Sequence, residues 1–218
     1  MYTVSIINES AARQRFVLYH ASPFSGDVDG FGNVWMDVTV NEGGDTQNLR
    51  LSAESFAWAG TTETPLQSGV VVCSGKSLPA ALGGGETRGA TFYTTVVGNS
   101  VNLQEDDGGA PKGAYQIKTL DDFDVGDTKV LIGLSKEKNG RPVPVASLNP
   151  LPNTVYNVTP VLKAVITVNN SSPVGEALTY QAISDFPGIV DFSAGSGLGK
   201  FTAVVIFTSR GGFEVDYV

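Results

Sequence analysis

His20 is the residue in this chain whose side chain is best suited to acid–base chemistry, and it is the only histidine. Asp27 and Asp29 follow it in a glycine-rich segment. Imidazole titrates near neutral pH, and a neighbouring carboxylate orients the ring and raises its basicity, so the three residues are candidates for a catalytic base and its partners. The alternative is a structural histidine at the end of a strand, hydrogen-bonded to the backbone. Because nearness in sequence is not contact, we favour the structural role.

Nucleophilic catalysis finds little support in the residue types. A Ser–His–Asp or Cys–His arrangement would have to use His20, and no serine stands within a G-x-S-x-G segment. Cys73 ends the apolar run 70–72, which is typical of a small residue in a buried strand. A single cysteine also excludes a zinc site built from several thiolates. The sequence therefore does not favour a hydrolase with a catalytic triad.

The acidic residues that follow His20 resemble the start of a calcium-binding loop. Asp27 and Asp29 stand at alternate positions, as oxygen ligands do in such loops. Phe31 and Val38 occupy the places of a third oxygen ligand and of the bidentate carboxylate, so an EF-hand is excluded. Other acidic groups are interpreted as solvated turn residues, at 105–107 and 121–127. We predict no metal site and no cofactor, while calcium binding by the acidic loops stays open.

Aromatic residues are the strongest indication of a binding site. Four of them lie in or beside apolar runs: Trp58, Phe56, Tyr19 and Trp35. Large and small residues alternate in the segment 56–60, so Phe56 and Trp58 project to one face of a strand. The indole N–H of a tryptophan needs a partner, which favours a place where a core meets a polar opening. We expect these four residues to line a ligand cavity with Trp58 at its border; the alternative is that they fill the core.

The composition limits the classes of protein to which the chain can belong. Its 218 residues include 26 Gly and 11 Pro, and 41% are hydrophobic, which is typical of a globular protein with many turns. With 22 acidic against 14 basic residues and a net charge of -8, a surface that follows nucleic-acid phosphates is not expected. No stretch approaches the roughly 20 apolar residues that span a bilayer, and no secretory leader is recognisable. We expect a cytoplasmic protein without nucleic-acid or membrane partners.

Short runs rich in Val, Ile, Thr, Phe and Tyr recur along the chain, separated by turn residues such as Asn139 and Gly140. The predicted strands are 2–7, 15–20, 34–40, 69–73, 90–97, 114–118, 129–135, 154–159, 162–168, 177–182, 189–192, 201–208 and 213–218. This spacing predicts an all-β protein, specifically an antiparallel two-sheet β-sandwich with many short strands and little helix. No linker interrupts the pattern, so we expect a single β-sandwich domain over residues 1–218.

Three details of this pattern are specific enough to compare with a structure. Polar and apolar residues alternate over 213–217, which predicts a half-exposed strand. The run 201–207 is apolar on both faces at its centre, which predicts a strand covered on both sides. Residues 78–82 are the one candidate for a helical turn.

Several short segments resemble the RhiA-like family, named for a rhizosphere-expressed bacterial protein. The opening at 2–10 (YTVSIINES) is similar to its Y-x-V-x-V-x-N-x-S pattern. The segment 55–60 (SFAWAG), with GVV at 69–71 and LPA at 78–80, resembles its S-F-x-W-x-x-T … P-G-V-V … P-A-D stretch. Shorter similarities lie at 16–19 (FVLY), 132–135 (IGLS) and 152–160 (PNTVYNVTP). The resemblance implies a soluble intracellular all-β protein, and it implies no particular reaction or site residue.

Three functions are compatible with these observations. The first is binding of a small, largely apolar or aromatic molecule in an aromatic-lined cavity of the sandwich. The second is a cofactor-independent isomerase or cyclase acting on a biosynthetic intermediate, with His20, Asp27 and Asp29 as its acid or base. The third is a calcium-assisted, lectin-like interaction protein. We favour the first, which makes a small molecule the expected partner; the oligomeric state stays open.

Overall fold

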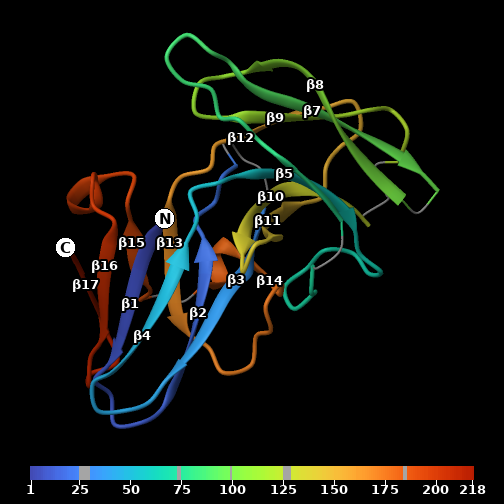
Figure 1. Ribbon diagram of the computed structural model, residues 1–218. Coiled ribbons are helices and arrows are strands. Elements are labelled where there is room, and N and C mark those ends of the chain that lie inside the picture. Colours follow the sequence, from blue (N-terminus) through green and yellow to red (C-terminus); the bar gives the residue numbers. More distant parts are fainter. Residues whose placement is uncertain (25–29, 73–74, 99, 125–128, 184–185) are drawn as a thin grey trace.

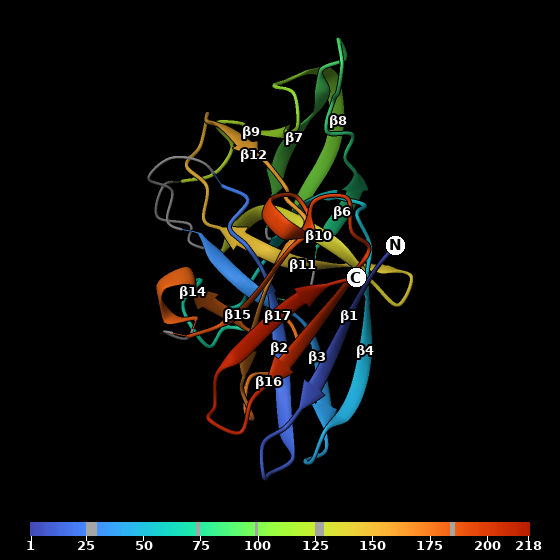
Figure 2. The ribbon, with the colours of Figure 1, turned by 90° about the vertical axis from the view of Figure 1, so that its left-hand side faces the viewer.

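The computed structural model describes residues 1–24, 30–72, 75–98, 100–124, 129–183 and 186–218. Strands dominate these residues, and their helical part consists of two short 3-10 segments, η1 (Tyr180–Ala182) and η2 (Gly195–Gly197). The strands form three sheets that pack around a common interior (Figures 1 and 2). The predicted all-β, sandwich-like fold class is therefore confirmed.

The first sheet contains both ends of the chain. Its order is β17-β16-β1-β4, and its strands are β17 (Phe213–Tyr217), β16 (Thr202–Phe207), β1 (Tyr2–Asn8) and β4 (Asp45–Leu51). β1 pairs in parallel with β16 on one side and antiparallel with β4 on the other. The N-terminal strand therefore holds the C-terminal hairpin in place (Figure 2).

The large sheet runs through the middle of the molecule, with nine strands among the described residues. Its order is β15-β13-β2-β3-β11-β10-β5-β6, and β14 also pairs with β3. The strands are β15 (Gly188–Asp191), β13 (Lys163–Val168), β2 (Gln14–His20), β3 (Phe31–Val40), β11 (Arg141–Leu148), β10 (Val130–Lys138), β5 (Phe56–Thr61), β6 (Lys76–Pro79) and β14 (Ala177–Thr179). β10 and β11 form a hairpin whose turn residues Asn139 and Gly140 have φ values of 54° and 78°, as a two-residue turn requires.

The third sheet projects at the top of Figure 1. Its order is β12-β9-β7-β8, with β12 (Val155–Val158), β9 (Tyr115–Thr119), β7 (Gly89–Val97) and β8 (Ser100–Ala110). β7 and β9 are parallel. This sheet and the two parallel pairs are features that the local sequence pattern does not reveal, because alternation within one strand does not specify its partner.

The main hydrophobic core takes side chains from all three sheets. Ile132 and Leu134 of the large sheet belong to the same buried cluster as Ile6 of the first sheet and Phe92 of the third, and all four are completely buried. Two smaller hydrophobic clusters lie around Trp58 and Leu131 and around Val17 and Tyr19. Along the strands of the large sheet, these residues alternate with residues of the main core. The large sheet is therefore covered, in part, on both of its faces.

Several local expectations differ from the structure. The predicted strand 69–73 is not formed over 69–72, where Gly69 lies in a turn and Val71 makes one isolated bridge to Glu176; Cys73 lies outside the described residues. The candidate helical turn at 78–82 is wrong, because β6 pairs with β5 there. The acidic segment 105–107 belongs to strand β8 and not to a turn. At 78–79 and 105–107, pairing with a neighbouring strand overrides the local signal.

The burial of β16 and β17 tests the two predictions made from alternation. β17 is half-exposed as expected, with Glu214 and Asp216 in solvent. In β16, Ala203 and Val205 are buried, whereas Val204 and Ile206 are only partly covered, so the strand is not enclosed on both sides. Among the described residues, β16 contacts β1, β17 and β15, and its core-facing side chains are the ones that become enclosed.

Gly133 in β10 lies where three elements come together. A Cβ at this position would overlap the carbonyl oxygen of Ala146 in β11. The buried hydroxyl of Tyr115, from the third sheet, donates a hydrogen bond of 2.8 Å to the carbonyl oxygen of Gly133. Glycine therefore allows β11 to approach β10 closely while the third sheet is joined to the large one.

We predict that Gly133→Ala lowers the free energy of unfolding by about 3 kcal/mol, because β11 must move away to admit the methyl group. The matched control is Gly84→Ala, since no atom lies within 4 Å of a Cβ added at Gly84. That change should stay within about 0.5 kcal/mol. Urea unfolding monitored by fluorescence measures the stability of both variants. Equal urea midpoints for Gly133→Ala and Gly84→Ala would contradict the close approach of β11 to β10 at Gly133.

Candidate functional site

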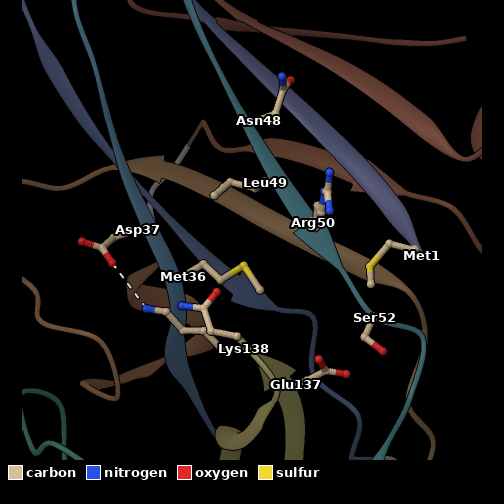
Figure 3. Close-up of a pocket in the computed structure, with 10 residues that line it drawn as sticks. Met1, Met36, Asp37, Asn48, Leu49, Arg50, Ser52, Glu137 and Lys138 are labelled. Carbon is tan, nitrogen blue, oxygen red and sulfur yellow. Dashed lines mark ion pairs between the residues drawn. The ribbon is translucent and has the colours of Figure 1, made fainter.

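An open cleft of about 400 Å³ lies between β3, β4 and the tip of the β10–β11 hairpin (Figure 3). Its wall is formed by Met1, Met36, Asp37, Asn48, Leu49, Arg50, Ser52, Glu137, Lys138 and Asn139. β4 is the last strand of the first sheet, so the cleft follows the edge where the first sheet and the large sheet diverge.

Apolar and charged groups are separated within this cleft. Met1, Met36 and Leu49 supply apolar surface, and methionine adapts to apolar bodies of different shape. In Figure 3, Asp37 and Lys138 stand on one side of the hollow and Arg50 on the other. The arrangement suits a molecule with an apolar part and a polar or charged end.

The cleft is lined by two cationic side chains, Arg50 and Lys138, and by two carboxylates, Asp37 and Glu137. Asp37 pairs with Lys138 at 3.6 Å and also with Arg15 at 3.1 Å, so one carboxylate serves two cations. Among the described residues no carboxylate forms an ion pair with Arg50. The cleft therefore presents cations that can meet an anion, together with the carboxylate of Glu137.

A buried lysine lies directly behind the cleft wall. Lys136 of β10 is 2% exposed, and its Nζ donates hydrogen bonds to Ser55 Oγ at 2.9 Å and to the carbonyl oxygen of Ala53 at 3.2 Å. Burial lowers the pKa of Lys136 to about 8. Within the part of the chain that the structure describes, no carboxylate forms an ion pair with it.

His20 is completely buried at the end of β2 and does not line the cleft. Its Nδ1 lies 2.5 Å from the carbonyl oxygen of Ala21, which makes Nδ1 the donor. Burial, and then the Lys136 ammonium that faces it, lower the pKa of His20 to about 3. The backbone contact agrees with the structural role. Its proposed catalytic partners, Asp27 and Asp29, lie outside the described residues.

None of the four aromatic candidates lines the cleft, and three of them are buried. Trp58 is 1% exposed and packs with Leu66 and Leu131, so it does not stand at an opening in the free protein. Trp35 and Tyr19 are also buried, and Trp35 Nε1 donates to the carbonyl oxygen of Glu137 at 3.2 Å. Phe56 is partly buried on β5. Their contact with a ligand stays a prediction.

Sequence reasoning missed both the cleft and the Lys136–Ser55 pair. The one available signal was a lysine that continues the apolar run 130–134 and falls on its buried face. No group of three or more His, Cys, Asp or Glu that could hold a metal ion is found among the described residues. Likewise, the described part of the chain has no helix long and apolar enough to cross a bilayer.

Comparison with known proteins gives one result. The family model described as RhiA matches residues 1–217. No curated protein and no solved structure gives a significant match.

The depressed pKa of His20 predicts a pH dependence of stability. Its value in the folded protein, about 3, lies below the 6.5 of an unperturbed histidine, so the unfolded chain binds more protons between these values. Stability should therefore fall as the pH falls from about 6 to 4, with a contribution from His20 of about 1.4 kcal/mol per pH unit. Urea unfolding of the wild type and of His20→Gln isolates this contribution. If the free energy of unfolding changes with pH by the same slope in both proteins, His20 is not buried in its neutral form.

Proposed function

The chain belongs to the RhiA family, and from this premise we propose that it binds a small molecule with an apolar body and an anionic group in the cleft between β3, β4 and the β10–β11 hairpin. The family supplies no reaction or ligand, so the chemistry of the cleft carries the proposal. The main observation is the combination of an apolar floor, made by Met36 and Leu49, with Lys138 and Arg50 on opposite walls.

The dimensions and the charges of the cleft both support this ligand class. A volume of about 400 Å³ lies in the range that holds metabolites and drug-sized molecules, about 300 to 1,000 Å³. Arginine binds carboxylate and phosphate groups through paired hydrogen bonds, and lysine binds them as a point charge. The apolar body keeps the ligand class expected from the sequence, and Met36 and Leu49 supply apolar surface in this cleft.

We predict that 8-anilinonaphthalene-1-sulfonate, an aromatic anion, binds the folded protein saturably, and that Lys138→Gln and Arg50→Gln each weaken this binding about tenfold, equivalent to 1.4 kcal/mol. Loss of one charge-assisted contact has this magnitude. Asp37 keeps its pairing with Arg15 when Lys138 is replaced, so the fold should be unaffected. Fluorescence titration measures the dissociation constants.

The control for this titration is Lys112→Gln, which removes the same charge from an exposed position outside the cleft. It should bind the dye as the wild type does. Decanoate should displace the dye more effectively than decanol, because only the acid presents a negative group. Equal weakening by all three substitutions, or equal displacement by acid and alcohol, would show that the dye does not report a specific anion site in the cleft.

A further inference from the structure

Two charged side chains of the cleft have no partner of opposite charge. Arg50 and Glu137 both line the cleft, and neither takes part in an ion pair among the described residues. The other two charges of the cleft, those of Asp37 and Lys138, are joined at 3.6 Å. The cleft therefore presents one cation and one carboxylate that the neighbouring side chains do not neutralise.

The backbone holds these two charges in place from different sheets. Arg50 lies in β4 opposite Thr3 of β1, and Glu137 lies in β10 opposite Pro142 of β11. The indole of Trp35 also donates a hydrogen bond of 3.2 Å to the carbonyl oxygen of Glu137. Because both strands are paired, the positions that carry the two charges are fixed before any ligand binds.

A ligand that is only an anion does not match this set of charges. Arg50 and Lys138 attract its negative group, and the carboxylate of Asp37 is already engaged by Arg15 and Lys138. The carboxylate of Glu137 is not engaged in this way, and like charges that share one cleft repel each other. A ligand that carries a cation beside its anion converts this repulsion into an attraction.

We propose that the ligand of the cleft is a zwitterion, namely an α-amino acid with a large apolar side chain, whose ammonium group is bound by Glu137. The proposal rests on the proposed function and adds this group to it. Glu137 and Lys138 are consecutive residues and both line the cleft, so the two charges of the ligand have to lie within a few bonds of each other. An ammonium group and a carboxylate on one carbon atom meet this requirement.

The remaining contacts of the cleft suit the same ligand. In Figure 3, Arg50, Ser52 and Glu137 lie on the side of the hollow away from Asp37. Ser52 Oγ accepts a hydrogen bond of 3.2 Å from the backbone N–H of Glu54, which leaves the hydroxyl proton to donate to a ligand carboxylate. The apolar side chain of the amino acid then lies against the floor of the cleft. A primary ammonium group also donates hydrogen bonds to a carboxylate, which a quaternary ammonium group cannot do.

The test compares ligands that share one alkyl chain. Each competes with 8-anilinonaphthalene-1-sulfonate for the full chain at neutral pH, below the concentration at which it forms micelles. We expect 2-aminodecanoate to displace half of the dye at a concentration about tenfold lower than decanoate, because one charge-assisted contact is added. N-acetyl-2-aminodecanoate, which lacks the cation, should lose this advantage. Decylphosphocholine, which has both charges but no N–H donor, should require a higher concentration than 2-aminodecanoate.

Variants of Glu137 locate the contact with the ammonium group. In Glu137→Gln, 2-aminodecanoate and decanoate should displace the dye at concentrations that agree within about twofold, because the amide carries no charge. Glu137→Asp keeps the carboxylate and should retain a preference for the amino acid. The matched control is Glu86→Gln, which removes the same charge from an exposed position outside the cleft. It should keep the full preference of the wild type.

The outcomes that overturn the proposal differ from those that overturn the binding function. Equal displacement by 2-aminodecanoate and decanoate in the wild type, or a preference that survives in Glu137→Gln, removes the ammonium contact. A lower half-displacement concentration for decylphosphocholine than for 2-aminodecanoate removes the amino-acid assignment. In these cases displacement by decanoate leaves the proposed anion site intact. If neither decanoate nor 2-aminodecanoate displaces the dye, the proposed function and the zwitterion are both wrong.

Discussion

The inner face of the nine-stranded sheet has to be shielded from water, and two separate four-stranded sheets share this task. Val4 and Ile6 cover one part of it from the first sheet, and Phe92 and Ile117 cover another from the third. Burial of apolar surface is the main favourable contribution to folding, so this division determines how the chain must run. Because the covering strands belong to two separate sheets, the chain has to pass repeatedly between sheets. Each of these passages brings backbone groups into the interior.

Polar side chains in the core satisfy the backbone at these passages. Lys136 donates to the carbonyl oxygen of Ala53, where the chain passes from β4 to β5, and Tyr115 donates to that of Gly133, where the third sheet meets β10. The carbonyl group of Gly133 is buried and would be costly without a donor, so the contact with Tyr115 holds the third sheet against β10. The same low-polarity environment depresses the pKa values of Lys136 and His20, because both must give up hydration to be charged.

The cleft arises from the same architecture. β4 is an edge strand, and beyond it the hairpin of β10 and β11 diverges from the first sheet, which leaves a space bordered by Leu49, Met36 and Lys138. Asp37 is shared by two cations, Arg15 and Lys138. The proposed ligand would therefore place its apolar body against Leu49 and Met36 and its anionic group near Lys138.

The sequence by itself determined the features that depend on neighbouring residues. Alternation placed Glu214 and Asp216 outside in β17, Asn139 and Gly140 marked a tight hairpin turn, and the end of the strand at His20 suggested a backbone contact. Tertiary structure alone decided which strands pair and which faces are covered. It put an acidic run inside β8, enclosed Trp58, and brought Ser55 to Lys136 across 81 positions. The physical reason is that sheet pairing uses backbone hydrogen bonds, which are the same for every residue type, whereas burial of a face depends on a layer that comes from a distant part of the chain.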